Sequence, residues 1–136
     1  MVAEARRWIG TPYVHQASLL GAGCDCLGLV RGVWRALRGA EPAKVPPYGP
    51  DWAETGGDEA LWRALGQHLR PAGAQAEPGD VLLFRLRAGS VAKHLGILTQ
   101  TGPGARFVHA YSGQGAVESP LSNPWARRIV ARFDLT

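Results

Sequence analysis

The sequence predicts an α+β fold, with helices in the first half of the chain and strands in the second half. Apolar residues recur at helical spacing in the first half, whereas after Glu77-Pro78-Gly79 they form the short runs typical of strands. Short turns join these runs, which favours an antiparallel sheet. With 136 residues, of which 46% are hydrophobic and 19% charged, the chain has the composition of a globular protein, and we expect one domain over residues 1–136.

The first predicted helix runs from Val2 to Ile9. It is followed by Gly10-Thr11-Pro12, where the residue before the proline disfavours helical geometry. Tyr13 to Gly23 has no regular apolar period, and we expect it to be irregular. The segment from Ala40 to Gly57 contains four prolines and several glycines, so we interpret it as a surface connector within the domain.

A second helix is predicted between Asp25 and Gly39. Asp25 suits the N-cap, where a carboxylate accepts hydrogen bonds from first-turn amides, and Gly39 suits the C-terminal end. The apolar residues at the spacing of one buried helix face are Leu27, Val30, Trp34 and Leu37. Cys26 then lies in the first turn, where the helix dipole and unpaired amides stabilise a thiolate, so we expect the pKa of Cys26 to be lowered.

A third helix of about 12 residues is predicted after Thr55, with apolar residues at helical spacing from Ala60 to Leu69 and with Pro71 as its end. About five strands are expected to follow it. In chain order they are Asp80 to Phe84, His94 to Leu98, Arg106 to Tyr111, Gln114 to Glu118, and Arg127 to Phe133.

The chain is moderately basic, with a net charge of +4 from 13 arginines and 2 lysines against 11 acidic residues. The arginines are scattered and the sequence contains no nucleic-acid-binding motif, so we expect mild attraction to anionic surfaces or a protein partner and no direct nucleic-acid binding. Met1 to Trp8 lacks the apolar core of a signal peptide, and no apolar run reaches the length of a membrane span. We therefore expect synthesis in the cytoplasm and no membrane insertion. Cys24 and Cys26 are too close in sequence for an unstrained disulfide, and we expect free thiols.

Cys26 is a candidate nucleophile if the fold supplies a base for its proton and a group that orients that base. His94 opens one predicted strand and His109 lies in the next. A hairpin of these strands would place both imidazoles on one face, with His94 as the base and His109 as its orienter. The alternative remains open that the cysteines only pack in the core and that each histidine is structural.

Five segments of the chain, in this order, resemble the NlpC/P60 cysteine peptidases, and in particular the phage-type cell-wall peptidases of tails or gene-transfer-agent-like particles. The segments are Trp8 to Tyr13, Asp25 to Val30, Pro78 to Phe84, His94 to Leu98, and Phe107 to Ala110. The patterns Asp-Cys-x-Gly-Leu-Val and His-x-Gly-Ile are the specific ones, and the likeness spans nearly the whole chain. The sequence departs from the family at Leu27, where a small residue such as serine is more common, and near His15, where an aromatic residue is more common.

The resemblance implies a papain-like core, in which the helix that begins at Cys26 packs on a C-terminal antiparallel sheet of about five strands. It assigns Cys26 as the nucleophile, His94 as the base and His109 as the third polar residue of the site. Tyr13 matches the tyrosine that helps to bind the oxyanion or orients the thiolate.

Three residues beside this site have simpler expected roles. Asp25 supports the helix as its N-cap. His15 is either a residue at the rim of the substrate site or a structural residue, and both roles stay open. Cys24 is expected to take no part in the reaction.

The function that the resemblance implies is hydrolysis of amide bonds in peptidoglycan stem peptides, typically between D-glutamate and the following diamino acid. The expected setting is a phage-like tail that opens the cell wall during nucleic-acid delivery, with tail hub or baseplate proteins as partners. No metal or organic cofactor is expected, because a thiolate, an imidazole and amide donors suffice for acyl transfer. Two alternatives stay open: a mainly structural tail hub or capping protein, and an acyltransferase on the same scaffold.

Overall fold

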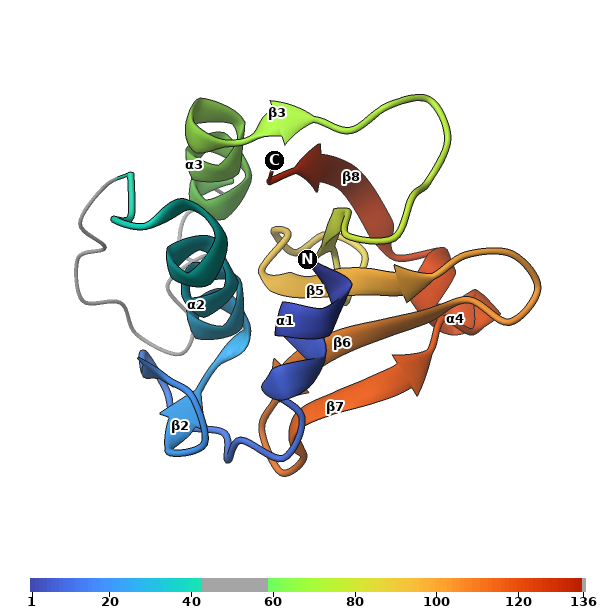
Figure 1. Cartoon of the computed structure of the whole chain (residues 1–136). Coiled ribbons are helices and arrows are strands. Elements are labelled where there is room, and N and C mark those ends of the chain that lie inside the picture. Colours follow the sequence, from blue (N-terminus) through green and yellow to red (C-terminus); the bar gives the residue numbers. More distant parts are fainter. Residues whose placement is uncertain (43–58, 136) are drawn as a thin grey trace.

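The computed structural model of the chain describes residues 1–42 and 59–135 and has an α+β architecture (Figure 1). The helices α1 (Val2–Arg7), α2 (Cys26–Arg38) and α3 (Ala60–His68) pack on one side of a six-stranded sheet. Its strands are β3 (Arg70–Pro71), β4 (Val81–Phe84), β5 (His94–Gln100), β6 (Arg106–Tyr111), β7 (Gly115–Pro120) and β8 (Ile129–Asp134). Neighbouring strands are antiparallel and follow the order β3-β8-β4-β5-β6-β7. The predicted α+β class, with the helix of Cys26 packed on an antiparallel sheet, is confirmed.

Three small elements complete the described fold. The strands β1 (Ser18–Leu19) and β2 (Gly23–Cys24) form a short antiparallel hairpin ahead of α2, and α4 (Asn123–Ala126) lies between β7 and β8. The segment from Tyr13 to Gly23 is therefore less irregular than the sequence predicts. Its hairpin turn includes Gly21 at a φ of 78°, a left-handed conformation that glycine adopts without strain.

Two expectations about the chain after α2 are wrong in detail. The main sheet has a sixth strand, because Arg70 and Pro71 pair with β8 at the sheet edge. Proline is tolerated at an edge, so Pro71 belongs to a strand and α3 already ends at His68. Thr55 and most of the predicted connector from Ala40 to Gly57 lie outside the described residues.

Side chains alternate between the two faces of the sheet and separate two apolar clusters. The cluster under α1, α2 and α3 includes the strand residues Val81, Leu83, Leu95, Ile97 and Val108. The cluster on the opposite face contains Leu82, Phe84, Leu98 and Phe107, with Trp125 of α4 packed against it. His94 pairs with Phe84 across β4 and β5, and His109 pairs with Gly96 across β5 and β6. Both histidines therefore belong to the face that Trp125 covers.

The helix α2 begins and ends where the sequence predicts, but its buried face is shifted. The Asp25 carboxylate caps the first turn, and Gly39 follows the last turn at a φ of 83°. Leu29 is fully buried, whereas Leu37, which the apolar spacing placed on the buried face, is 42% exposed.

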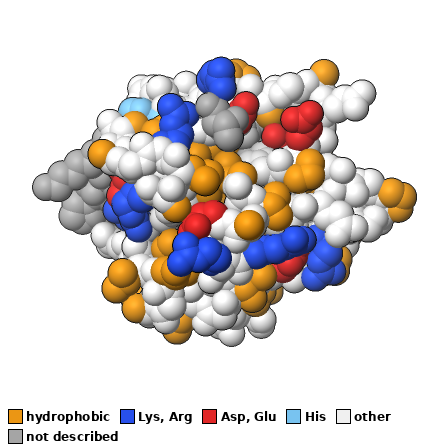
Figure 2. Space-filling model, in the orientation of Figure 1, with side chains coloured by type: hydrophobic (Ala, Val, Ile, Leu, Met, Phe, Trp, Pro, Cys, Tyr) orange, Lys and Arg blue, Asp and Glu red, His pale blue; other side chains and the backbone are white. Residues whose placement is uncertain are grey.

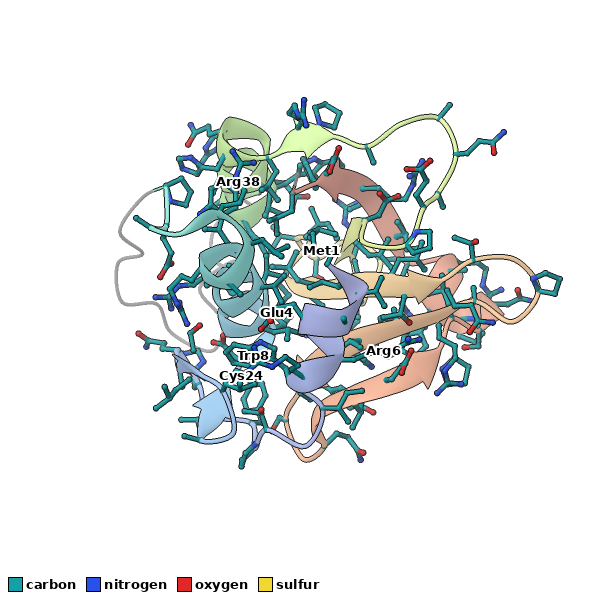
Figure 3. The ribbon with its side chains drawn as sticks, viewed as in Figure 1. Met1, Glu4, Arg6, Trp8, Cys24 and Arg38 are labelled. Atoms are coloured by element: carbon teal, nitrogen blue, oxygen red, sulfur yellow. The ribbon has the colours of Figure 1, made fainter. Side chains whose placement is uncertain are left out.

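The shift follows from two glycines that let other segments lie directly on α2. A Cβ on Gly28 would lie 1.8 Å from the carbonyl oxygen of Ala17, and a Cβ on Gly32 would lie 2.0 Å from the ring of Trp8. Figure 3 shows Trp8 between α1 and α2. The loop before α2 and the end of α1 thus widen the buried side of the helix beyond the stripe that contacts the sheet.

Charged side chains on the face seen in Figure 2 mostly lie beside a charge of the opposite sign. On α1, Arg7 pairs with Glu4 at 2.9 Å and Arg6 pairs with Glu118 of β7 at 3.0 Å. Within the described residues, no helix combines the length and the apolar character that a membrane crossing requires.

Candidate active site

Cys26 is the first residue of α2, and its thiol lies against the segment that leads into His94. The Sγ atom is 3.7 Å from the carbonyl oxygen of Lys93, the residue before His94. Burial, and after it the charge of Asp25, raise the pKa of Cys26 to about 12, against the opposing effect of nearby backbone amides. The lowered pKa expected from the helix N-terminus is therefore wrong, because loss of hydration outweighs the favourable amides.

Asp25 joins the loop before α2 to the start of the helix. Its Oδ1 accepts a hydrogen bond from the Gly28 amide and its Oδ2 accepts one from the Gln16 amide, both at 2.7 Å. Gln16 has a φ of 68°, which is unusual for a residue other than glycine. His15 Nδ1 lies 3.8 Å from Oδ2 of the same carboxylate. The expected N-cap role of Asp25 is thus accompanied by a second role, which is to hold the loop that carries His15.

His94 and His109 form a hydrogen-bonded pair on adjacent strands. The distance from His94 Nε2 to His109 Nδ1 is 2.9 Å, and both residues are buried. Burial, and then the charge of His109, lower the pKa of His94 to about 3, while burial lowers the pKa of His109 to about 4. Both imidazoles are therefore neutral at pH 7.

The two histidines meet diagonally across the strands. The residue paired with His109 is Gly96, two positions after His94 on the same face of β5. A Cβ on Gly96 would lie 2.8 Å from the ring of Phe107 and 3.4 Å from the Cβ of His109. The glycine of the His-x-Gly-Ile pattern thus leaves room beside the pair.

Ser119 extends the pair by one polar group, and sequence reasoning missed it. The distance between His109 Nε2 and Ser119 Oγ is 2.9 Å. On β7, Ser119 pairs with Phe107, two residues before His109, so it reaches the imidazole along another diagonal. A serine in a predicted strand carries no signal of this contact, because the contact depends on the register between β6 and β7.

Trp125, from the short helix α4, covers the histidine pair and was also missed. Its ring centroid lies 5.6 Å from that of His94 and 5.0 Å from that of His109. Phe84 and Tyr111 contribute further aromatic contacts to His94. This cover removes the imidazoles from water, which is the main cause of their lowered pKa values.

Tyr13 and Cys24 also lie near the nucleophile candidate. Tyr13 forms an isolated parallel bridge with Cys24, directly before Asp25 and Cys26. Burial, followed by the nearby Cys26, Asp25 and Cys24, raises the pKa of Tyr13, so the phenol stays protonated and can donate a hydrogen bond. Cys24 is fully buried and both thiols are free.

Over residues 1–42 and 59–135, no three His, Cys, Asp or Glu side chains gather in a way that could hold a metal ion.

The α+β domain thus combines a cysteine at the start of a buried helix with a buried histidine pair whose leading segment lies against that cysteine, and these are residue types that thiol hydrolases use. The sequence profile of the NlpC/P60 family matches residues 10–133, and the chain belongs to this family.

Two relatives are informative. The chain is 32% identical over 137 aligned positions to the Gamma-DL-glutamyl hydrolase of Bacillus subtilis (strain 168), covering 98% of this chain and 29% of that protein. It also resembles the crystal structure of an NlpC/P60 family protein from Bacillus cereus ATCC 10987, with a TM-score of 0.62 and 14% identity over 97% of this chain and 39% of that chain. The second likeness supports the fold. In both cases this chain spans less than half of the relative's length.

Proposed function

We propose that the chain is a cysteine hydrolase that cleaves amide bonds of peptidoglycan stem peptides, between D-glutamate and the following diamino acid. The observation that carries the proposal is the 2.9 Å hydrogen bond between His94 and His109, together with the 3.7 Å distance from Cys26 Sγ to the carbonyl oxygen of Lys93, directly before His94. Membership of the NlpC/P60 family and the relative named as a γ-DL-glutamyl hydrolase support the substrate class.

Whether His94 can act as a base depends on which ring nitrogens of His94 and His109 carry a hydrogen. His94 uses Nε2 for His109, so in the proposed mechanism Nδ1 is the nitrogen that takes the proton of Cys26. Nδ1 has a free lone pair only if Nε2 carries the hydrogen and donates it to His109 Nδ1. His109 then carries its hydrogen on Nε2 and donates it to Ser119 Oγ. With these tautomers, His94 donates to His109 and His109 donates to Ser119. His109 therefore accepts a hydrogen bond from His94 and stabilises the imidazolium that forms when His94 takes a proton.

The reaction then proceeds by acyl transfer through the sulfur. As Sγ of Cys26 attacks the carbonyl carbon, its proton moves to His94 Nδ1, because neither a thiolate nor an imidazolium exists beforehand. Collapse of the tetrahedral intermediate breaks the C–N bond, and His94 returns the proton to the leaving amine. Water, deprotonated by His94, then hydrolyses the thioester and restores the thiol.

Tyr13 is assigned to the oxyanion of the tetrahedral intermediate. Its raised pKa keeps the hydroxyl protonated, so it can donate a hydrogen bond to the developing negative charge. First-turn amides of α2 are the other donors available at this position.

The test is digestion of a synthetic L-Ala-γ-D-Glu-diaminopimelate peptide, with fragments identified by mass spectrometry. We expect cleavage after D-glutamate by the wild type and none by Cys26→Ala or His94→Ala. His109→Asn should retain part of the rate, because asparagine can still accept the hydrogen of His94. Cys24→Ala is the matched control and should cleave normally. Cleavage by Cys26→Ala would exclude the cysteine mechanism.

The same assay separates the alternatives. An acyltransferase would give a new amide when an amine such as diaminopimelate is added in excess, whereas a hydrolase gives only free D-glutamyl product. A mainly structural tail protein would cleave nothing, and its particles would tolerate Cys26→Ala without loss of infection.

We further propose that the protein acts as a component of a phage-like tail that opens peptidoglycan locally, docked on hub or baseplate proteins. The resemblance of its five motif segments to phage-type wall peptidases supports this setting. Mass spectrometry of purified particles should find the polypeptide. Its absence from particles, together with activity in the cell fraction, would favour a wall-recycling enzyme.

A further inference from the structure

A groove of about 510 Å³ beside α4 is lined mainly by arginines. Its lining residues are Arg85, Leu86, Arg87, Ala88, Arg127, Arg128 and Val130. No aspartate or glutamate is among them, although Arg85 is paired with Glu59, which lies outside the lining, at 2.5 Å. The stems of the arginines and the neighbouring aliphatic residues form the walls, so the groove combines a positive charge with an apolar surface.

The groove lies at the end of the sheet where β5 begins. Phe84 pairs with His94, and the amide of Lys93 donates to the Phe84 carbonyl. Arg85 follows Phe84, and its amide donates to the carbonyl of Arg128 at 2.8 Å. Adjacent strands lie about 5 Å apart, so the groove begins within roughly 10 Å of the His94 backbone. That distance is the length of about three residues of an extended peptide.

The guanidinium groups on the α4 side of the groove are not neutralised by described carboxylates. Arg128 donates to the carbonyl oxygens of Leu86 and Pro124, at 3.0 and 2.8 Å, which fixes the side chain and leaves its charge uncompensated. Arg127 is exposed, and no ion pair joins it to the part of the chain that the structure describes. The arginines of α1 differ, because each has a glutamate partner.

We propose that this groove binds carboxylates of the substrate peptide that flank the scissile amide. The inference rests on the proposed function, because a γ-glutamyl linkage leaves the α-carboxylate of glutamate free and the diamino acid adds another. An arginine fork binds a carboxylate through two parallel hydrogen bonds, which a carboxamide cannot match in charge. The groove therefore makes the hydrolase selective for acidic stem peptides over amidated ones.

Arg127→Gln is the primary variant, because Arg127 has no described ion pair to lose. We expect its KM for a stem peptide with free carboxylates to rise about three- to five-fold, with kcat unchanged. Its KM for the same peptide with carboxamides should equal that of the wild type. Arg127→Lys keeps the positive charge but lacks the two parallel donors of a guanidinium, so its KM for the acidic peptide should lie between those of the wild type and Arg127→Gln. Salt should raise the wild-type KM for the acidic peptide only.

Arg70→Gln is the control, since it removes the same charge from an exposed arginine on the edge strand β3, where Arg70 makes a 3.9 Å ion pair with Asp134. Equal KM values for Arg127→Gln and Arg70→Gln on the acidic peptide would overturn the inference while leaving the proposed function intact.

A binding measurement separates the two proposals completely. Calorimetric titration of both peptides into Cys26→Ala protein, with and without Arg127→Gln, reports carboxylate binding without turnover. We expect Arg127→Gln to weaken binding of the acidic peptide alone. Equal affinity for both peptides in the parent protein would overturn the inference. Selective binding without any hydrolysis by the wild type would instead overturn the proposed function.

Discussion

Cys26, His94 and His109 are all electrically neutral in the resting protein at pH 7. Burial raises the pKa of the thiol to about 12 and lowers those of the imidazoles to about 3 and 4. Neutral imidazoles place no charge against the apolar cover of Trp125, and in the proposed mechanism the proton of Cys26 moves only at the moment of attack.

Alkylation of Cys26 should therefore depend on pH without a plateau in the neutral range. With a pKa of about 12, the thiolate fraction grows tenfold per pH unit, so the rate with iodoacetamide should do the same between about pH 6 and 9. The measurement uses Cys24→Ala protein, so that the rate belongs to Cys26. A rate that levels off below pH 7 would instead indicate a preformed thiolate–imidazolium pair.

Ser119 should act through the tautomer of His109. Ser119→Ala removes the acceptor of His109 Nε2, and a lost hydrogen bond of this kind corresponds to a fall of about tenfold in kcat. KM should not change, because Ser119 is two groups away from the nucleophile. Ser119→Thr keeps a hydroxyl in the strand and should restore most of kcat. If Ser119→Thr is as slow as Ser119→Ala, packing and not the hydroxyl is what matters.

The helix α2 connects the parts of the candidate site. Cys26 is its first residue, and both the sheet and the segment that follows Tyr13 pack against it. Of the two glycines of this helix, Gly28 has the less space, because a Cβ there would lie 1.8 Å from the Ala17 carbonyl oxygen, against 2.0 Å from Trp8 at Gly32. The Ser18 hydroxyl also donates to the carbonyl of Gly28 at 2.6 Å, which holds the hairpin of β1 and β2 on the helix.

Gly28→Ala should destabilise the protein by about 3 kcal/mol or more, because a Cβ 1.8 Å from a backbone oxygen forces the loop away from α2. Gly66→Ala is the control in α3, where a Cβ would meet nothing within 4 Å. That change should be neutral or stabilise by up to about 1 kcal/mol through helix propensity. Urea denaturation of both variants measures the difference, and equal stabilities would contradict the packing assigned to Gly28.

At the scale of the whole molecule, the buried histidine pair should make stability depend on pH. The pKa of each imidazole is lower in the folded chain than its ordinary value of 6.5, so the unfolded chain binds more protons below that pH. The stability that the two neutral imidazoles contribute to the folded state is fully present above pH 6.5, and it is lost as the pH falls toward their folded-state pKa values of about 4 and 3.

We expect the free energy of unfolding to fall by roughly 2 kcal/mol for each histidine between about pH 7 and 5. Urea denaturation at several pH values measures the slope. His68→Ala, which alters an exposed histidine, should keep the slope, whereas a double change of His94 and His109 to alanine should flatten it. An unchanged slope in the double variant would show that other groups control acid sensitivity.

The sequence by itself determined the α+β class, both ends of α2 and the strands that carry His94 and His109, whereas the pairing of these strands came from the structure. These features follow from local information: Asp25 and Gly39 act on the residues next to them, and apolar periods report the secondary structure of their own segment. Family motifs supplied the candidate roles of the site residues, which remain predictions.

Only the tertiary structure decided the protonation of the site, the contact of Ser119 with His109, the cover by Trp125 and the arginine groove. Each of these features depends on contacts between segments that are distant in the chain, so no local sequence pattern predicts it. The pKa of Cys26 shows the reason most clearly: the helix N-terminus, visible in the sequence, favours the thiolate, while burial against β5, which the fold alone creates, opposes it more strongly.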